Sequence, residues 1–315
     1  MYNILVTGVG SIIGYGIIDG LRKSGLPVNI TGIDIYDDAY GGFCSDRFVQ
    51  GVRAADPGFI DFINDLTDRN NIDLIIPGIE PDLYTLWENR DRLRTKVVFG
   101  NELCLNLAKD KLYTFNYLSA FDISLIPTLH AVSYEQCVTQ LGVPFLLKPV
   151  LSSASKGIER ISTMEEFEFF TNRIHGHCVY QRIVSSMDEE YTSAVFGDGK
   201  GGYFDSIILK RTLSGEGSTN RALRVEDDLI QDYITRLCQI LKPVGPLNIQ
   251  LRKEEGVVYL LEINTRVSSS CSIRTMMGYN EPEMCVRYFL MNESIQKGNR
   301  TARKAIRYIA DFKID

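Results

Sequence analysis

The chain has 315 residues, a formal net charge of −6 and a pI near 5.3. Hydrophobic residues make up 44% and charged residues 23%, which is typical of a globular protein in water, and the length predicts more than one core. The acidic balance disfavours a nucleic-acid partner, because proteins that bind the phosphate backbone usually present a basic surface.

A membrane partner and an exported location are also disfavoured. The first apolar segment, Ser11–Lys23, is interrupted by glycines and charges, so it predicts neither a membrane span nor a signal peptide, and we expect a cytoplasmic protein. The seven cysteines are scattered without a C-x-x-C pair, which favours reduced, buried thiols over disulfides or a zinc site. With three histidines in the chain, histidine-based catalysis is disfavoured.

The first 108 residues alternate between strands and helices, which predicts a parallel α/β domain. Gly8, Gly10 and Gly14 follow the first strand and Asp34 ends the second, as in dinucleotide-binding domains. However, the spacing is G-x-G-x-x-x-G, and the chain has no Tyr-x-x-x-Lys pair for a dehydrogenase or epimerase. An NAD-dependent enzyme is therefore the weaker interpretation. We expect the strands near residues 3–7, 28–34, 73–77 and 96–99.

From Lys109 the pattern changes to further helices and a strand-rich region. Lys111 opens a predicted helix, and Lys148 ends a short apolar strand before the small-residue loop 152–157. Small residues let the backbone approach phosphates, and the two lysines could add point charges there. Taken alone, each lysine is better explained as a solvated surface charge. We expect helices near residues 111–121, 134–141 and 226–241, and strands near 145–149 and 179–184.

The most informative segment runs from Tyr259 to Arg266. It places Glu262, Asn264 and Arg266 at every second residue after an apolar run, so their side chains should share one face of a strand. Such a face can offer oxygen ligands to magnesium and a guanidinium to phosphate. Gln250 lies on the preceding strand, across a predicted hairpin turn, within reach of the same ion. The alternative is an ordinary strand with polar residues in solvent.

Substrate contacts are predicted at three further positions. Glu80 follows a parallel strand at the edge where open α/β sheets place ligands, and it could bind an amine. Arg211 lies in the segment Lys210–Thr219, which we expect to be a mobile loop after a strand, and it suits a phosphate or a carboxylate. Arg274 follows a small-residue turn that could border the acceptor. A structural or solvated role is equally open for all three.

Taken in order, these elements resemble the ATP-grasp superfamily, most closely the carbamoyl phosphate synthase large-subunit-like branch of carboxylate-amine ligases. The resemblance spans nearly the whole chain and is strongest in Gly245–Gln250 and Leu261–Ser268. It implies an α/β fold with a Rossmann-like pre-ATP-grasp domain at residues 1–108. An ATP-grasp fold of two α+β subdomains would follow, at residues 109–183 and 184–315.

The resemblance also implies roles for single residues, with ATP and Mg²⁺ or Mn²⁺ as cofactors. The residues expected to hold the ATP phosphates are Lys111, Lys148, Ser153, Ser155 and Gly157. Those expected to hold the adenosine are Gln181, Arg182, Ile183 and Glu190. The metal would be positioned by Gln250, Glu262 and Asn264. Arg266 would stabilise the transferred phosphoryl group, with Lys148 and Arg211 as further catalytic side chains.

Two positions depart from the family pattern. The family's phosphate loop is usually glycine-rich, whereas here Gly157 stands among serines and an alanine. The adenine strand normally carries a glutamate after the glutamine, and here the residue is Arg182. Serine hydroxyls and backbone amides can still donate to phosphate, so these departures leave nucleotide binding possible and turnover open.

The chemistry implied is ATP-dependent joining of a small-molecule carboxylate to an amine or to ammonia through an acyl phosphate. Such phosphoryl transfer needs positioning and charge neutralisation rather than a protein nucleophile. A carbamoyl phosphate synthase-like carboxylate kinase is one alternative, although the full synthase needs two such modules. The other alternative is a catalytically silent ATP-binding sensor or scaffold. The resemblance leaves a homodimer open.

Overall fold

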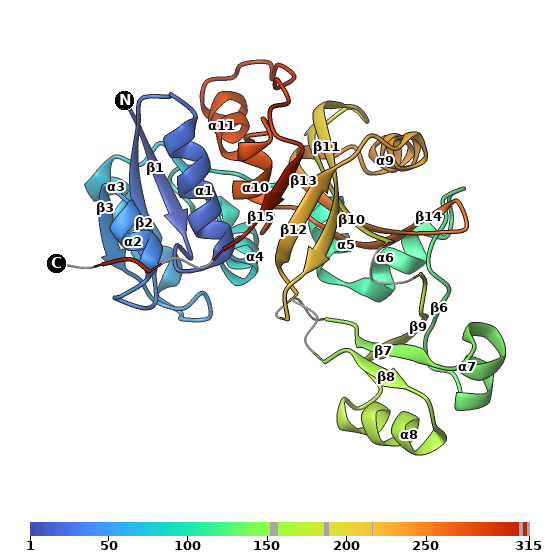
Figure 1. Cartoon of the computed structure of the whole chain (residues 1–315). Helices are drawn as coiled ribbons and strands as arrows, with labels where there is room; N and C mark the ends of the chain where they lie inside the picture. Colours follow the sequence, from blue (N-terminus) through green and yellow to red (C-terminus); the bar gives the residue numbers. More distant parts are fainter. Residues whose placement is uncertain (152–156, 186–188, 216, 309–310, 314–315) are drawn as a thin grey trace.

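The computed structural model describes residues 1–151, 157–185, 189–215, 217–308 and 311–313. These residues form a five-stranded, a six-stranded and a four-stranded sheet. Figure 1 shows the N-terminal domain beside a central body, with a smaller lobe projecting from that body. The expected α/β class, with parallel and antiparallel sheets in separate parts of the chain, is confirmed.

The N-terminal domain is a parallel sheet with the strand order β3-β2-β1-β4-β5. Its central strands are almost continuous apolar runs because helices cover both faces of a parallel sheet. The strands are β1 (Tyr2–Thr7), β2 (Val28–Asp34), β3 (Arg47–Gln50), β4 (Leu74–Ile76) and β5 (Lys96–Val97). The helices are α1 (Ile12–Lys23), α2 (Tyr40–Cys44), α3 (Phe59–Asn70) and α4 (Glu80–Glu88), followed by a 3-10 turn (Arg90–Arg92).

Glycines on α1 allow the C-terminal part of the chain to dock on this domain. A Cβ atom at Gly16 would lie 3.2 Å from the Cβ of Cys271, and one at Gly20 would lie 2.7 Å from the Cγ of Pro282. The helices that dock there are α10 (Cys271–Met276) and α11 (Glu281–Cys285), followed by a π-helical turn (Val286–Leu290). The glycines that interrupt α1 therefore serve close helix packing.

The central body contains an antiparallel sheet with the order β14-β13-β10-β11-β12-β15. Apolar side chains on one face of the sheet pack against α9, whose buried residues form an apolar stripe along the helix, and against α5 and α6. The strands are β10 (Glu190–Asp198), β11 (Tyr203–Leu213), β12 (Thr219–Arg224), β13 (Val244–Glu254), β14 (Val257–Asn264) and β15 (Lys304–Ile306). The helices are α5 (Glu102–Lys109), α6 (Lys111–Leu118) and α9 (Asp228–Leu241).

The other face of this sheet divides into two halves. Ala194 and Phe196 belong to the core shared with the N-terminal domain, whereas Val195 between them belongs to the core under α9. Because strand residues alternate between faces, Glu190 and Thr192 share the face of Ala194 and Phe196. One half of this face is therefore apolar and holds the N-terminal domain, and the other half is polar.

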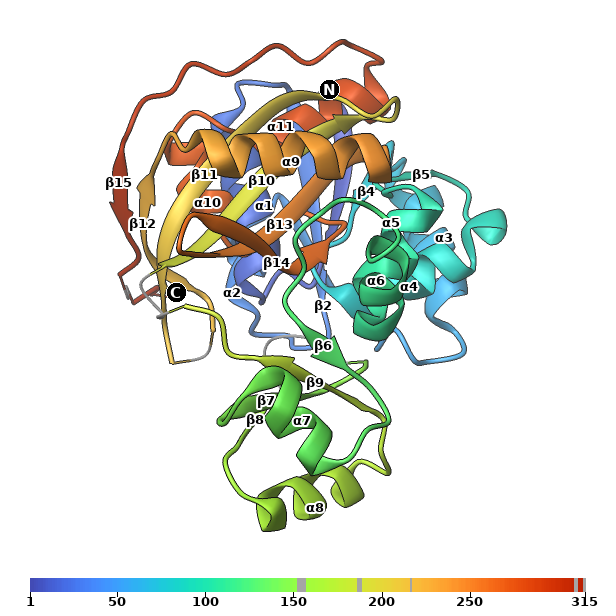
Figure 2. The same ribbon diagram turned by 90° about the vertical axis from the view of Figure 1, so that its right-hand side faces the viewer.

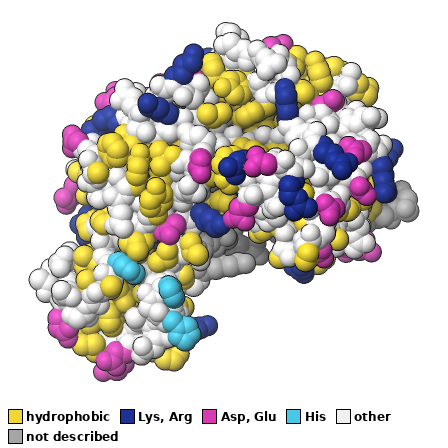
Figure 3. All heavy atoms as spheres, turned by 180° about the vertical axis from the view of Figure 1, so that it is seen from behind, with side chains coloured by type: hydrophobic (Ala, Val, Ile, Leu, Met, Phe, Trp, Pro, Cys, Tyr) yellow, Lys and Arg dark blue, Asp and Glu magenta, His cyan; other side chains and the backbone are white. Residues whose placement is uncertain are grey.

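The projecting lobe, which we call the small subdomain, is a four-stranded sheet with two helices on it (Figure 2). The space-filling view from behind shows the lobe projecting from the rest of the molecule (Figure 3). Both helices begin with a capping box, Ser133 with Gln136 and Thr163 with Glu166. The strands are β6 (Thr128–Leu129), β7 (Phe145–Pro149), β8 (Glu159–Ile161) and β9 (Cys178–Arg182), in the order β6-β9-β7-β8. The helices are α7 (Tyr134–Leu141) and α8 (Met164–Arg173).

One boundary differs from the sequence expectation. Helix α6 was expected in the small subdomain, but Leu118 at its end lies in the core of the central body, so the lobe begins at Thr128. Near the C-terminus, β15 pairs with β12, and the chain then returns to the N-terminal domain. There the ring of Phe312 contacts Tyr40, with centroids 5.2 Å apart.

Two further findings concern the sequence as a whole. Six of the seven cysteines are buried and Cys44 is half-buried, all as free thiols. Within the described ranges, every helix is too short or too polar to cross a bilayer.

Candidate functional site

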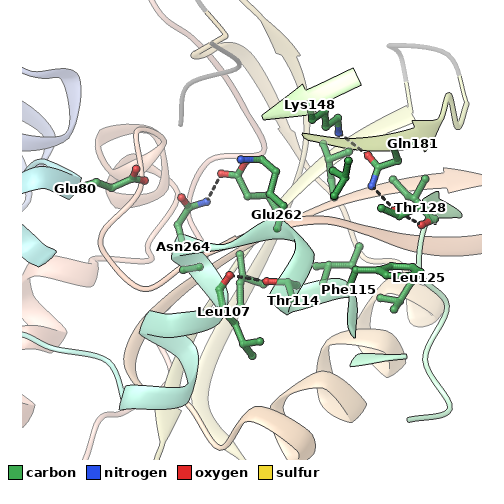
Figure 4. A pocket seen from close by; sticks show the side chains of 17 residues that line it. Glu80, Leu107, Thr114, Phe115, Leu125, Thr128, Lys148, Gln181, Glu262 and Asn264 are labelled. Carbon is green, nitrogen blue, oxygen red and sulfur yellow. Dashed lines mark hydrogen bonds between the residues drawn. The ribbon is translucent and has the colours of Figure 1, made fainter. Parts of the chain in front are cut away.

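A narrow cavity of about 60 Å³ lies where the central body, the small subdomain and the N-terminal domain meet (Figure 4). Helices α5 and α6 form one wall, β7 and β9 another, and β14 the floor. The polar side chains that line it are Glu80, Lys111, Thr114, Thr128, Lys148, Gln181, Glu262 and Asn264. We call this space the first cavity.

The floor of the first cavity is the end of β14. The Nδ2 of Asn264 donates to Oε1 of Glu262 at 3.0 Å, and Nη2 of Arg266 donates to Oδ1 of Asn264 at 3.2 Å. The three side chains predicted to share a face are thus in contact. In the described part of the chain, no three His, Cys, Asp or Glu side chains are grouped to hold a metal. A divalent cation here would therefore rest on Glu262, Asn264 and the oxygens of a bound phosphate, a set that suits magnesium.

Gln250 is the third predicted metal ligand, and its side chain points elsewhere. Its backbone lies opposite Glu262 in the β13-β14 ladder, as expected. However, its Oε1 accepts a hydrogen bond from Nη2 of Arg211 at 2.8 Å, and Gln250 does not line the first cavity.

Two lysines face the floor. Lys148 is only 6% exposed, and its Nζ donates to Oε1 of Gln181 at 2.5 Å, whose Nε2 in turn donates to Oγ1 of Thr128. Burial lowers the pKa of Lys148 to about 8, while the carboxylate of Glu262 acts in the opposite direction. Burial also lowers the pKa of Lys111, again opposed by Glu262. Two partly desolvated ammonium groups that share a cavity favour an anionic ligand, because an anion offsets both the burial and their mutual repulsion.

The predicted amine ligand Glu80 and the predicted phosphoryl ligand Arg266 are bound to each other. Nη2 of Arg266 donates to Oε1 of Glu80 at 2.6 Å, and both side chains are less than a fifth exposed. Glu80 is the first residue of α4 and lines the first cavity. The ion pair joins the N-terminal domain to the end of β14, so it ties the edge of the parallel sheet to the cavity floor.

Glu190 and Arg211 are placed differently from their predicted roles. Arg211 lies inside β11 rather than on a mobile loop, because β11 continues to Leu213 before the hairpin to β12. It is 6% exposed and pairs with Glu190 at 2.8 Å, while the other oxygen of Glu190 pairs with Arg252 at 2.9 Å. Glu190 is 3% exposed and does not line the first cavity, so the expected ribose contact stays a prediction.

Arg274 does not border an open site, as the sequence suggested. It is fully buried, its Nη1 lies 3.3 Å from Oε2 of Glu281, and it donates to Ser268, Thr192 and Asn248. Its guanidinium joins α10, α11 and two strands of the central sheet. These contacts favour the structural role that the sequence left open for Arg274.

Among the remaining predicted ATP contacts that the structure describes, Gln181 lines the first cavity. Ser153 and Ser155 fall outside the described residues, and Gly157, which follows them, has a φ of +72° that favours glycine. Nη2 of Arg182 donates to Oε2 of Glu254 at 2.9 Å. Arg182 and Ile183 do not line the first cavity, whereas Gln181 does.

Sequence reasoning missed the apolar walls of the first cavity. Phe115 on α6, Leu125 before β6 and Leu260 on β14 all line it, and Leu125 forms an isolated bridge with Leu260. These three residues come from different elements, and no regular spacing in the sequence connects them. The one available signal was the apolar run before Glu262, which was used to predict a strand rather than a wall.

Comparisons with known proteins agree on the fold. A family model described as "ATP-grasp in the biosynthetic pathway with Ter operon" matches residues 188–312. The chain is 24% identical over 229 residues to the carbamoyl phosphate synthase large chain of Thermoanaerobacter pseudethanolicus. That match covers 61% of this chain and 21% of the relative, so the chain corresponds to about a fifth of that protein.

Solved structures give wider coverage at lower identity. An N5-carboxyaminoimidazole synthetase from Staphylococcus aureus superposes with a TM-score of 0.74 at 13% identity, covering 95% of this chain and 80% of that one. The biotin carboxylase domain of a 2-oxoglutarate carboxylase from Hydrogenobacter thermophilus also gives a TM-score of 0.74 at 13% identity. It covers 96% of this chain and 73% of that one, and its structure contains MgADP, ADP and bicarbonate.

Proposed function

We propose that this chain, which is similar to proteins of the ATP-grasp superfamily, is an ATP-dependent ligase that joins a small-molecule carboxylate to an amine or to ammonia. The observation that carries this proposal is the convergence of Lys111, Lys148, Glu262 and Asn264 on one cavity from three separate elements. Two cations beside a pair of hard oxygen ligands suit a nucleoside triphosphate with its divalent cation. The MgADP in the related biotin carboxylase domain supports the same choice.

In the proposed complex, Lys148 and Lys111 bind phosphate oxygens, and Gln181 presents its amide to the nucleotide. Lys148 must exchange its bond to Gln181 for a phosphate, which frees both side chains for the ligand. Glu262 and Asn264 would hold Mg²⁺, which when bound neutralises charge on the phosphate oxygens. Arg266 would stabilise the transferred phosphoryl group from the edge of the floor.

The proposed reaction has two steps. A carboxylate oxygen of the substrate attacks the γ-phosphorus of ATP, the bond from that phosphorus to the β,γ-bridging oxygen breaks, and ADP leaves with the bond's electron pair. The amine nitrogen then attacks the acyl carbon, the bond to the phosphate oxygen breaks, and inorganic phosphate and a proton are released. The protein supplies position and charge, since phosphoryl transfer of this kind needs no covalent intermediate with a side chain.

The size of the first cavity bears on how ATP would enter. Sites for small molecules typically occupy roughly 300–1,000 Å³, whereas this cavity measures about 60 Å³. The small subdomain supplies Lys148, Gln181 and Thr128 to one wall and projects from the body as a lobe. We infer that it moves outward to admit ATP and closes over the phosphates to exclude water.

The test is to measure ADP and phosphate release from Mg·ATP with the purified chain. A panel of carboxylic acids, including amino acids and sugar acids, is crossed with ammonia and a set of amines. The proposal expects one acid and amine pair to release ADP and phosphate in equal amounts and to yield the amide by mass spectrometry. Glu226→Gln, at a largely exposed carboxylate, is the control for Glu262→Gln, which should lose this release.

The remaining outcomes separate the alternatives. ADP release with an acid and without an amine, together with an acyl phosphate trapped by hydroxylamine, would favour a carboxylate kinase. ATP binding that persists across the whole panel without ADP release would favour the sensor interpretation and contradict the ligase. Absence of ATP binding would contradict both.

A further inference from the structure

A second and larger cavity, of about 550 Å³, lies in the N-terminal domain and is lined in part by Ala39 and Tyr40 at the start of α2. It is formed by the segments that follow the carboxyl ends of β1, β2, β3 and β4. The strand order β3-β2-β1-β4-β5 reverses its direction at β1, and open α/β sheets bind ligands outside their carboxyl ends at such a reversal. The volume is also within the usual range for small-molecule sites. We call this space the second cavity.

The glycine loop at the second cavity is not arranged for a dinucleotide. The amide of Gly10 donates to Oδ2 of Asp34 at 2.8 Å, the amide of Ser11 to Gly8, and the amide of Gly14 to the Ser11 hydroxyl. These donors would have to face the pyrophosphate in a dinucleotide site. Here they already have acceptors, and one acceptor is a carboxylate that would repel a phosphate. A Cβ at Gly14 would lie 2.3 Å from the carbonyl oxygen of Gly8, so close packing accounts for that glycine.

The charged groups that line the second cavity are mainly acidic. Asp34, Asp38 and Asp82 line it, against one exposed guanidinium, that of Arg53. Asp82 is 5% exposed, and burial raises its pKa to about 6, opposed by a hydrogen bond with Thr7. A desolvated carboxylate of this kind gains most from a cationic partner, because the cation restores the stabilisation that water no longer supplies.

Aromatic side chains flank these acids. Tyr36 and Tyr40 line the second cavity and are 60% and 42% exposed, and Phe312 packs its ring against Tyr40. Exposed rings beside carboxylates can hold an organic cation through its apolar body and through attraction of the ammonium to the ring face.

The second cavity adjoins the first without merging with it. Within the first turn of α4 and the residue before it, Glu80 lines the first cavity, whereas Ile79, Pro81 and Asp82 line the second. We propose that the second cavity is a binding site for a primary amine with an aromatic or apolar body, separate from the ATP site. The acidic lining selects the ammonium, and the tyrosines hold the body. This inference does not depend on the proposed ligase activity.

The test uses three probes of the same shape and different charge: tyramine, neutral 4-ethylphenol and anionic 3-(4-hydroxyphenyl)propionate. Binding to the whole chain is measured by isothermal titration and by ligand-observed NMR, without ATP. We expect tyramine to bind at least about tenfold more tightly than either of the other probes, as one charge-assisted hydrogen bond to a carboxylate predicts. Absence of tyramine binding, or equal binding of 4-ethylphenol, would overturn the proposal.

Variants locate the site. Asp82→Asn keeps the shape of the side chain and should weaken tyramine binding at least about tenfold, and Asp38→Asn at the exposed rim should weaken it less. Asp37→Asn is the matched control, because Asp37 is exposed on the same segment and lies outside the lining. Thermal melting of each variant checks folding. Should Asp82→Asn fold poorly, the Asp38→Asn result still decides, since an effect no larger than that of Asp37→Asn would overturn the assignment.

Competition separates the second cavity from the first. We expect saturating Mg·ATP to leave tyramine bound, since the two ligands would occupy different spaces. Displacement of tyramine by Mg·ATP would place the amine in the first cavity and contradict the proposal. Displacement of tyramine by NAD⁺ would favour the dinucleotide interpretation of the glycine loop and would also contradict the proposed amine site.

Discussion

Two groups of polar and charged side chains, on the central sheet and on the elements that pack beside it, differ in what their hydrogen-bonding groups contact. Lys148, Glu262 and Asn264 line the first cavity and are bonded to other residues of the same cavity. Arg211 and Arg274, by contrast, are buried and paired with the carboxylates of Glu190 and Glu281. Both groups hold polar side chains with little exposure, but among these described residues the first group lines a cavity and the two arginines line neither cavity.

The role of a charged residue near a site therefore follows from the groups it contacts rather than from its residue type. A buried guanidinium held by several acceptors positions the elements that supply those acceptors. A lysine whose pKa is lowered in a cavity gains from the arrival of an anion. Variants in the first group should therefore affect ligand binding and turnover, and variants in the second should affect folding.

The largest effect is expected at Arg274. Arg274→Met should lower the free energy of unfolding by about 3–5 kcal/mol, because it leaves Glu281 buried without its cation. Urea unfolding followed by circular dichroism measures this loss. The double variant Arg274→Met with Glu281→Gln should recover part of it, since the unpaired charge is then removed. A loss below about 1 kcal/mol would place Arg274 with the ligand-binding group instead.

The next effect is expected at the cavity floor. Glu262→Gln should lower the ADP-release rate of the proposed ligase at least about 100-fold, since it removes the carboxylate among the predicted metal ligands. Its melting temperature should stay within about 2 °C of the parent, because Glu262 is not part of a buried ion pair. Unchanged release in this variant would show that the metal is held elsewhere.

A smaller effect is expected for ATP affinity at Lys148. Lys148→Met should raise the Kd for ATP by about tenfold or more, because one charge-assisted contact to a phosphate is lost. Titration calorimetry measures the change, and Lys200→Met at an exposed turn is the control. Equal Kd values for the two variants would remove Lys148 from the phosphate site.

The smallest effect is the pH dependence that Lys148 should give to ATP binding. Its pKa is lowered to about 8, so the side chain is charged below that pH and loses its proton as the pH rises through it. ATP affinity should therefore be highest below pH 8 and fall by no more than about tenfold per pH unit above it. Lys148→Arg should remove this fall, because a guanidinium stays charged throughout. The same slope in both proteins would assign the titration to another group.

Local patterns in the sequence predicted much of the fold and the centre of the site. The parallel N-terminal domain followed from alternating apolar strands and helices, and the shared face of Glu262, Asn264 and Arg266 followed from the two-residue period of a strand. The resemblance to the ATP-grasp superfamily was recognised from the same segment, a family model of that description matches residues 188–312, and the solved structures share the fold. These features depend on neighbours within a few residues, which is the range over which a sequence pattern acts.

The tertiary structure decided which charges face a cavity and which are buried. The partner of Arg266 is Glu80, 186 residues away, and Arg274 reaches Thr192, 82 residues away. The turn of Gln250 toward Arg211 and the packing of α6 on the central body were decided in the same way. A sequence states which groups are available, but burial and pairing depend on elements that folding brings together from distant parts of the chain. The period of a strand can therefore be read locally, whereas the partner of a buried charge cannot.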